Sequence, residues 1–313
     1  EILIHMNPLV SVICISYNHA PYIKEALNSV FNQAYTEIEV IVLDDGSSDA
    51  SVEEIKKLIL NRPEVTFIAN TENTGYTRTF NKGLALAKGK YIVDFALDDV
   101  MFPNFLNESI KQLEALGEGY GVCFSNADYI NSASKVIGNH NDSLRSKKLV
   151  SEIPQGDIFE MVLKRYFICT PTMVIRKSVF DRIGGYDEAL AYEDFDLWVR
   201  SSRYFKYTFV DKVLMQKRKL KTSMSALRYK HTENAQMLSV FMVCQKAFHL
   251  CKTADEFKAL NLRLAYEHRQ CVRNNFLDLA DRYFSLVKST KGNLVKIKLT
   301  EYLIRLGVGR KAF

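Results

Sequence analysis

Short apolar runs alternate with helix-like segments along the first third of the chain. Four short, mostly apolar runs predict strands, namely Val10–Ser16, Glu39–Leu43, Val65–Ile68 and Tyr91–Leu97, and the first of them fits a strand that is buried on both faces. Between them, residues from about 21 to 32, 50 to 60 and 79 to 87 carry helical patterns. This alternation predicts an α/β fold with a mostly parallel central sheet flanked by helices.

The middle of the chain continues with strands, and the last third becomes helical. We predict strands at 121–129 and 167–175, the second broken by Pro171, with a loop over the polar residues 131–148 and a helix that opens near residue 193. After about residue 225, long amphipathic patterns cover 226–251, 254–288 and 293–306. We therefore predict a main α/β domain at 6–225 and a C-terminal helical extension at 226–313.

Polar side chains follow three of the predicted strands, at Ser16–Asn18, Asp44–Asp45 and Asp98–Asp99. Because the carboxyl ends of parallel strands open on the same edge of a sheet, we expect these three groups to lie close together. Aspartates after a strand ordinarily form a turn. Adjacent carboxylates, however, repel each other unless a cation neutralises them. The convergence of three polar ends favours a site for Mg²⁺ or Mn²⁺ with a phosphate-bearing ligand.

Composition and charge are ordinary except at the C-terminus. The chain has 313 residues, 47% of them hydrophobic and 25% charged, which is typical of a globular protein. The formal net charge is +6, and residues 285–313 alone carry seven Lys or Arg against one Glu. Such a basic segment is most often a solvated helix face, and an anionic membrane surface is the partner that we consider for it, in preference to nucleic acid.

The six cysteines form no CxxC pair and no cluster with zinc spacing. We expect all six to be reduced, which indicates a cytosolic compartment. No apolar stretch reaches the length of a membrane span, and the first residues lack a signal-peptide pattern. We interpret residues 1–5 as a remnant of cloning, with Met6 as the native start.

Taken in order, the motifs resemble one family, the inverting, metal-dependent family 2 glycosyltransferases of bacterial type, which have a GT-A fold. The resemblance runs from about Val10 to Arg200. Ser11–Asn18 is similar to the family's opening strand and nucleotide loop, Val40–Asp49 to its second strand, and Ala87–Ile92 to the approach to its metal motif. Glu193-Asp194, before a helix with Asp-x-x-x-Arg spacing, is similar to the segment that supplies the catalytic base.

The resemblance implies a Rossmann-like GT-A fold that transfers a sugar from a nucleotide-diphosphate donor, a UDP-sugar first of all. The acceptor would be a carbohydrate or a lipid-linked molecule in surface polysaccharide or glycan synthesis. The domain would then hold a nucleotide-binding part at about 8–120 and an acceptor-side part at about 121–225. The residues that it implies for nucleotide binding are Ser16, Tyr17, Asn18, Asp45 and Asp98.

The physical roles of these side chains follow from the donor. Tyr17 can offer a ring face to the base, and Asp45 can accept a hydrogen bond from an imide N–H, although a sheet-closing aromatic and a turn cap are the alternatives. Asp98 would hold the ribose hydroxyls or the outer shell of the metal. Asp99 would coordinate Mn²⁺ or Mg²⁺, which stabilises the charge on the departing diphosphate.

An inverting reaction also needs a base that deprotonates the acceptor hydroxyl. Asp194 is our first choice and Glu193 our second, with helix capping as the alternative for each. Asp196 falls on another face of the helix, so we expect it to be structural.

The chain departs from the family pattern at three places. Ala96 replaces an aspartate, Phe80 replaces an arginine, and the basic run 217–221 lacks a histidine that often contacts metal or phosphate. Arg78, Arg218 or a neighbouring lysine could counter the diphosphate instead. These departures keep open a second hypothesis, a nucleotide-sugar-binding scaffold whose catalysis has decayed. A sugar-phosphate nucleotidyltransferase is less favoured, because the loop after the first strand has no glycine.

For the helical extension we expect packing against the catalytic domain or a homodimer interface. The basic helix around 296–306 is also a candidate for membrane-surface contact, which would make the protein peripheral at the inner face of the membrane.

Overall fold

The computed structural model describes residues 7–220 and 235–305. These residues form two compact units. The first comprises the chain up to Asp157 together with Phe167–Ala191 and Tyr204–Leu220, and the second comprises Ile158–Tyr166, Tyr192–Arg203 and the C-terminal helices. The predicted domain boundary near residue 225 stays a prediction, and the predicted cloning remnant lies outside the described residues.

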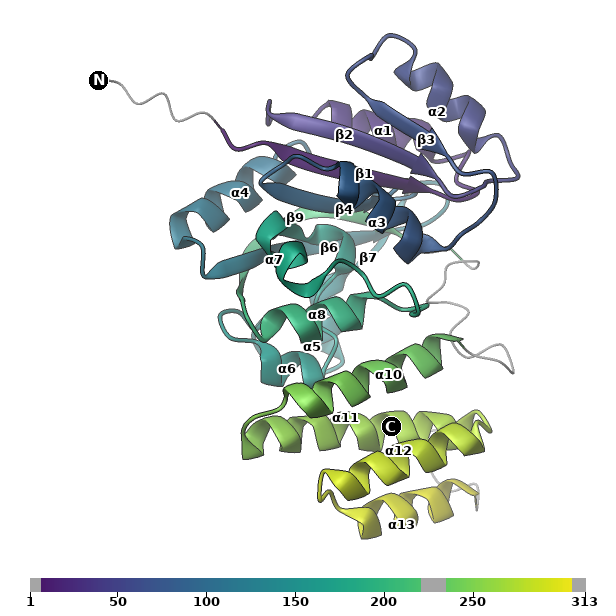
Figure 1. The fold of residues 1–313 in the computed structure, drawn as a ribbon, viewed down its shortest axis with the longest axis vertical. Coiled ribbons are helices and arrows are strands. Elements are labelled where there is room, and N and C mark those ends of the chain that lie inside the picture. Colours follow the sequence, from purple (N-terminus) through teal and green to yellow (C-terminus); the bar gives the residue numbers. More distant parts are fainter. Residues whose placement is uncertain (1–6, 221–234, 306–313) are drawn as a thin grey trace. The chain divides into compact units, whose positions relative to one another are not determined.

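The first unit is built on one mixed sheet (Figure 1). Its strands are β1 Val10–Ser16, β2 Ile38–Asp44, β3 Thr66–Ala69, β4 Tyr91–Ala96, β5 Val100–Met101, β6 Tyr120–Ile130, β7 Val136–Asn139, β8 Val174–Arg176 and β9 Lys206–Arg218. They follow the order β3-β2-β1-β4-β8-β6-β9-β5, and β7 pairs with β6. The strands β3, β2, β1 and β4 are parallel, as are β6 and β9, whereas β8 is antiparallel to both of its neighbours. The predicted α/β class with a mostly parallel sheet is confirmed.

Helices cover both faces of this sheet. They are α1 Ile23–Phe31, α2 Ser51–Ile59, α3 Tyr76–Leu86, α4 Phe105–Leu116, α5 His140–Ser146 and α7 Lys177–Ile183. Residues of α1, α2 and α4 share one buried core with Val12 and Cys14 of β1. On the opposite face, α3 approaches β1 and β2 so closely that a Cβ at Gly83 would lie 2.6 Å from Ile13 and 2.8 Å from Leu43.

Two predicted segments differ from the structure. Residues 131–148 are not simply a loop, because they contain β7 and α5, and the side chain of Asn139 caps α5 by accepting hydrogen bonds from the N–H groups of Asn141 and Asp142. The predicted strand 167–175 is reduced to β8, since Thr170–Thr172 forms a 3₁₀ turn around Pro171. The long strand β9 was not predicted.

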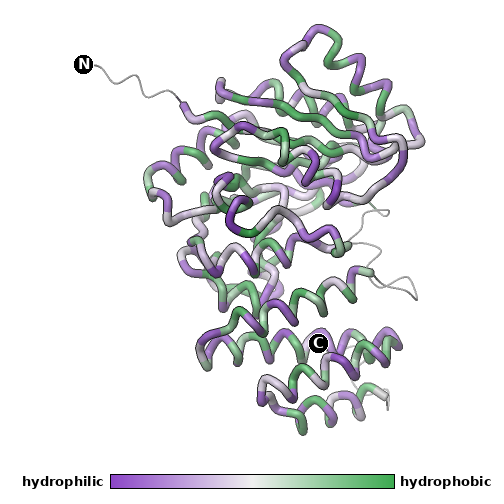
Figure 2. The backbone as a smooth tube through the Cα atoms, viewed as in Figure 1, coloured by the Kyte–Doolittle hydropathy of each residue, from purple (hydrophilic) through white to green (hydrophobic). Residues whose placement is uncertain are grey.

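The second unit is helical among its described residues. It contains α6 Phe159–Lys164, α8 Asp194–Ser202, α10 Ala235–Leu250, α11 Ala254–Arg273, α12 Leu277–Ser289 and α13 Leu294–Arg305. Figure 2 shows hydrophobic and hydrophilic residues alternating along the C-terminal helices. The predicted helix 254–288 is two helices, because Asn275 adopts a φ of 62° between α11 and α12. The predicted helical residues 226–234 lie outside the described part of the chain.

Two further predictions concern the redox state of the cysteines and the presence of membrane-spanning helices. All six cysteines are free thiols, as predicted. Within residues 7–220 and 235–305, no helix combines the length and the apolar character that a membrane crossing requires.

Candidate functional site

The aspartate pair lies in the tight turn between β4 and β5. Asp99 is 5% exposed, and its Oδ1 accepts a hydrogen bond of 2.7 Å from the backbone N–H of Arg218. Burial, and then the neighbouring carboxylate of Asp98, raise the pKa of Asp99 to about 8, against the opposing attraction of Lys217 and Arg218. The turn therefore holds a carboxyl group whose ionised form needs a nearby cation.

A hard divalent cation fits this pair. No group of three or more His, Cys, Asp and Glu side chains able to hold a metal occurs among the described residues. An all-protein cage is not required, because Mg²⁺ and similar ions are commonly held by one or two carboxylates together with substrate phosphates and water. Asp99, with Asp98 beside it, would supply that kind of donor set, and a bound cation would neutralise the charge of the ionised Asp99.

Arg218 fixes the aspartate turn from β9. Its Nε donates to the carbonyl oxygen of Asp98 at 2.7 Å, and one Nη donates to Glu25 on α1 at 2.7 Å. The guanidinium also lies 4.4 Å from the ring centre of Tyr22. Arg218 is 2% exposed and already engaged in these contacts, so it is a support of the turn rather than the residue that we would assign to the diphosphate.

Lys217 lies on the face of β9 opposite to Arg218, and Lys219 follows the end of the strand. Lys217 is close enough to lower the pKa of Asp99. Burial and Lys217 lower the pKa of Lys219, against the attraction of Asp99, and its Nζ lies 4.0 Å from the ring centre of Tyr129. Among the described basic residues of the run 217–221, Lys217 and Lys219 therefore remain as candidates to contact the diphosphate.

His140, which the sequence analysis did not single out, contacts Tyr129, the residue whose ring lies next to Lys219. The Tyr129 hydroxyl contacts His140 Nδ1 at 2.7 Å, and His140 Nε2 contacts the carbonyl oxygen of Phe167 at 2.9 Å. Burial lowers the pKa of His140, so it favours a neutral ring. Since the carbonyl only accepts, Nε2 carries the proton and Nδ1 accepts from Tyr129. This contact joins β6 to α5 and has no signature in the sequence.

The end of β2 is held by its own side chains. Asp44 caps its turn by accepting from the N–H of Ser47 at 2.8 Å and from its hydroxyl at 2.6 Å. Two residues after Asp44, Gly46 has a φ of 73°, and a Cβ there would lie 2.4 Å from the backbone of Glu72. The turn is therefore packed directly against the loop that precedes α3.

Asp45 is a centre of hydrogen bonding. Its Oδ1 accepts from Thr79 at 2.7 Å and from Asn70 at 3.0 Å, and its Oδ2 accepts from the N–H of Gly75 at 3.0 Å. Burial opposes ionisation, but these hydrogen bonds together lower the pKa of Asp45. The residue predicted to contact the base is thus an ionised carboxylate that also orders the loop before α3.

The end of β1 lies beside the end of β2, since the N–H of Asp45 donates to the carbonyl oxygen of Ser16 at 2.8 Å. Ser16 is fully buried, and its hydroxyl has no partner among the described residues. The side chain of Tyr17 is 45% exposed, which leaves a ring face accessible. Asn18 has a φ of 56° and accepts from the N–H of Ser48 at 2.9 Å, so it ties the two loops together.

The structure thus brings six predicted residues to one edge of the sheet in the first unit. They are Ser16, Tyr17, Asn18, Asp45, Asp98 and Asp99. Arg78, an alternative phosphate contact, lies instead 3.6 Å from Glu188 and is largely exposed. Phe80 is buried against Tyr186, with ring centres 4.4 Å apart, so the residue that departs from the family pattern is part of the core.

The predicted base residues belong to the second unit. Glu193 is the N-cap residue of α8 and is 6% exposed, whereas Asp194 is the first residue of the helix and is half-buried. Asp196 is fully buried and accepts hydrogen bonds from Arg200 at 2.6 Å and from Lys246 at 2.7 Å. The prediction that Asp196 is structural agrees with these contacts.

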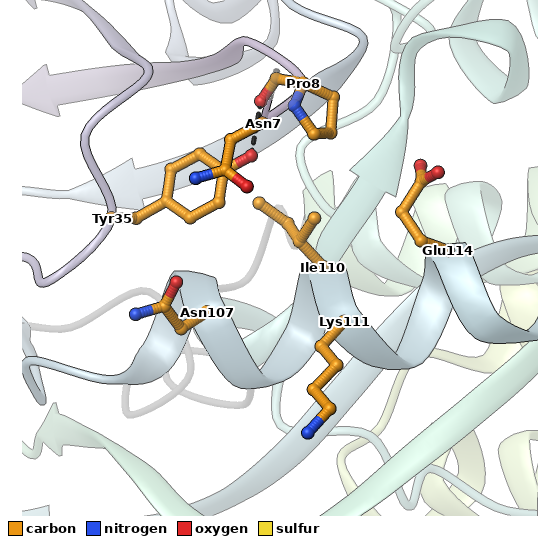
Figure 3. A pocket seen from close by; sticks show the side chains of 7 residues that line it. All are labelled: Asn7, Pro8, Tyr35, Asn107, Ile110, Lys111 and Glu114. Carbon is orange, nitrogen blue, oxygen red and sulfur yellow. Dashed lines mark hydrogen bonds between the residues drawn. The ribbon is translucent and has the colours of Figure 1, made fainter. Parts of the chain in front are cut away.

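A separate cavity of about 560 Å³ lies at the other end of the strands (Figure 3). It lies between the start of β1 and α4, with Tyr35, Lys111 and Glu114 in its wall, and the Tyr35 hydroxyl donates to the carbonyl oxygen of Pro8 at 2.5 Å. In α/β sheets, ligands bind at the carboxyl ends of the strands. The aspartate edge, and not this cavity, is therefore the candidate active site.

Comparison with solved structures identifies the fold. The structure resembles S. aureus TarS 1–349, solved in complex with UDP-GlcNAc, with a TM-score of 0.68, 16% identity, and coverage of 96% of this chain and 92% of that one. It also resembles mannosyltransferase PcManGT from Pyrobaculum calidifontis, solved with GDP-Man and Mn²⁺, with a TM-score of 0.64, 18% identity, and coverage of 96% and 81%. These likenesses place the fold among the GT-A glycosyltransferases.

The sequence comparisons give the family. The model of glycosyl transferase family 2 matches residues 11–184. An uncharacterized glycosyltransferase of Rickettsia prowazekii is 31% identical over 68% of this chain, and the match spans 64% of that relative's length. The chain therefore belongs to glycosyl transferase family 2.

Proposed function

We propose that this chain is a metal-dependent, inverting glycosyltransferase that moves a sugar from a nucleotide-diphosphate donor, most favourably a UDP-sugar. The acceptor is a carbohydrate or a lipid-linked molecule, and the reaction belongs to bacterial surface polysaccharide or glycan synthesis. The observation that carries the proposal is the Asp98–Asp99 turn at the sheet edge, where Asp99 is buried and its ionisation needs a cation. A bound Mn²⁺ or Mg²⁺ would supply Lewis-acid stabilisation of the leaving diphosphate.

The chain's own residues divide the remaining tasks. The exposed ring of Tyr17 would stack on the base, with Asp45 at the imide N–H and Asp98 at the ribose. Lys217 and Lys219 would face the phosphates as point charges, because Arg218 between them is already committed to the turn. Asp194 would take the proton of the acceptor hydroxyl, and its greater exposure favours it over Glu193.

The experiment that tests this function is a donor screen by thermal shift. We expect UDP-sugars to raise the melting temperature in the presence of Mn²⁺ and to lose that effect in EDTA, because only a bound ligand stabilises the folded state. Lys217→Met should weaken the response to UDP while leaving the response to uridine, which has no phosphate, unchanged. Slow hydrolysis of the donor selected in this way should release UDP.

Other outcomes of the screen would contradict the proposal. Donor binding without turnover, even with acceptor pools, would favour the nucleotide-sugar-binding scaffold. Release of pyrophosphate from UTP and a sugar 1-phosphate would favour a nucleotidyltransferase.

A membrane-surface contact through α13 is the second part of the proposal. One face of α13 exposes Val295, Leu299, Tyr302 and Leu303, which are 78%, 56%, 60% and 38% exposed and follow helical spacing. Exposed lysines at 296 and 298 lie beside them. Apolar residues next to lysines are typical of helices that lie on anionic lipid, where a lipid-linked acceptor would be found.

We expect the protein to sediment with vesicles that contain phosphatidylglycerol and not with phosphatidylcholine alone, and to be released by salt. Leu299→Ser should weaken this binding severalfold. Leu262→Ser on α11 is the matched control, since Leu262 is 55% exposed against 56% for Leu299. A face that serves instead as a homodimer interface would give a dimer in the absence of vesicles that Leu299→Ser dissociates.

A further inference from the structure

The helix that begins at Asp194 is joined to the C-terminal helices by an ion pair between a buried aspartate and a half-buried lysine. Asp196 of α8 is fully buried, and its Oδ1 accepts a hydrogen bond of 2.7 Å from Nζ of Lys246 on α10. Its Oδ2 accepts from Arg200, one turn further along the same helix. Because Arg200 lies on α8 itself, it stabilises that helix internally, whereas Lys246 fixes α8 to another element.

The other end of α8 is held in the same way. Arg203, the C-cap residue of α8, pairs with Glu256 of α11 at 2.7 Å. Glu256 is itself fixed, because it forms a capping box with Thr253 at the start of α11. Both ends of the helix are therefore anchored to the C-terminal helices by ion pairs, of which Asp196 is fully buried and Lys246, Arg203 and Glu256 are mostly buried.

Aromatic packing fills the space along the middle of α8. The ring of Tyr166 lies 5.1 Å from that of Phe195 and 5.9 Å from that of Trp198. Arg263 of α11 covers the Tyr166 ring at 4.0 Å, and its Nε donates to the carbonyl oxygen of Leu163 at 3.0 Å. This packing accounts for the grouping of residues 158–166 and 192–203 with the C-terminal helices in one compact unit.

We propose that the C-terminal helices position the catalytic base, and that Lys246 is the main positioning residue, acting through Asp196 on Asp194. This inference rests on the proposed function, in which Asp194 is the base. Asp196 lies two residues after Asp194, within the same first turn of α8, so a shift of its carboxylate moves the start of the helix with it. A base displaced by about 1 Å can lose roughly 100-fold in rate.

The test compares Lys246→Met, Lys246→Arg and, as a matched control on the same helical unit, Lys258→Met, whose lysine is exposed. The assay is release of UDP from the nucleotide sugar selected by the donor screen. We expect Lys246→Met to lower kcat roughly 10-fold to 100-fold, with the donor KM and the nucleotide Kd unchanged. Lys246→Arg should recover most of the rate, and Lys258→Met should behave as wild type. Arg200 still neutralises Asp196 in these variants, so the fold should persist. If Lys246→Met does not fold, Lys246→Gln replaces it in each comparison, because glutamine keeps a hydrogen-bond donor at this position.

A double variant separates positioning from a general loss of stability. If Lys246 acts through Asp194, Lys246→Met should have no further effect on the rate in an Asp194→Asn background. Additive losses in the double variant, or an unchanged kcat in Lys246→Met, would overturn the positioning role while leaving Asp194 as the base. A wild-type rate in Asp194→Asn alone would overturn the assignment of the base, and the positioning role with it.

Discussion

Asp99→Asn is expected to abolish metal-dependent binding of the donor, with a loss of more than about 100-fold in affinity for UDP in Mn²⁺. Even residues that only support metal ligands typically contribute about 10-fold to 100-fold in metal affinity, and Asp99 would be a direct ligand. Isothermal titration of UDP into the variant, with and without Mn²⁺, measures the effect. The difference between the two conditions should vanish in the variant and persist in wild type.

The fold should survive this change. The amide oxygen of asparagine can still accept the hydrogen bond from the N–H of Arg218. The folded-state pKa of Asp99 is about 8, above its ordinary value, so the metal-free wild type loses stability as pH rises from about 4 towards 8. Asparagine removes that cost, and metal-free Asp99→Asn should therefore melt no lower than wild type at neutral pH.

Asp98→Asn is the informative companion variant. If Asp98 binds the ribose, its loss should weaken UDP binding with and without Mn²⁺. If it serves the metal's outer shell, only the metal-dependent part should fall. Wild-type binding of UDP and Mn²⁺ by Asp99→Asn would rule out Asp99 as the metal ligand.

The parts of the fold that could be predicted are those encoded by local patterns. The four parallel strands are short, mostly apolar runs, and the polar residues that end three of them could be read directly from the chain. Their meeting at one edge followed from the geometry of parallel strands alone, which is why Ser16, Asp45 and Asp99 were found together.

The parts that could not be predicted depend on contacts between distant residues. Polar and apolar residues alternate too irregularly along β9 for the sequence to predict a strand there. Its role in the site is visible only in the structure, where Arg218 donates a hydrogen bond to the Asp98 carbonyl oxygen, 120 residues earlier in the chain. The hydrogen bonds of Asp45 to the loop before α3, and the contact between His140 and Tyr129, are likewise set by packing. The grouping of α8 with the C-terminal helices depends on Lys246 and Glu256: Lys246 belongs to no recognisable motif, and the capping box of Glu256 predicts the start of α11 but not its contact with Arg203.

Asp194→Asn is expected to lower sugar transfer, to water or to an acceptor, by between about 100-fold and about 10,000-fold, the usual contribution of a general base. Nucleotide binding should be unchanged, because the residues proposed for the donor belong to the first unit. Since asparagine is also well tolerated at a helix start and the lost interaction of this half-buried group with the helix dipole is at most about 2 kcal/mol, α8 should still form. Single-turnover rates with the selected donor measure the loss.

Glu193→Gln is the control that decides between the two acids. Glu193 is buried at the N-cap position, where its backbone carbonyl accepts from the N–H of Leu197 at 2.9 Å, and that bond does not depend on the side-chain charge. We therefore expect Glu193→Gln to retain most of the transfer rate. The reverse pattern, with Glu193→Gln inactive and Asp194→Asn active, would move the base to Glu193. Asp194 would then have a structural role at the helix start, where a carboxylate interacts favourably with the helix dipole.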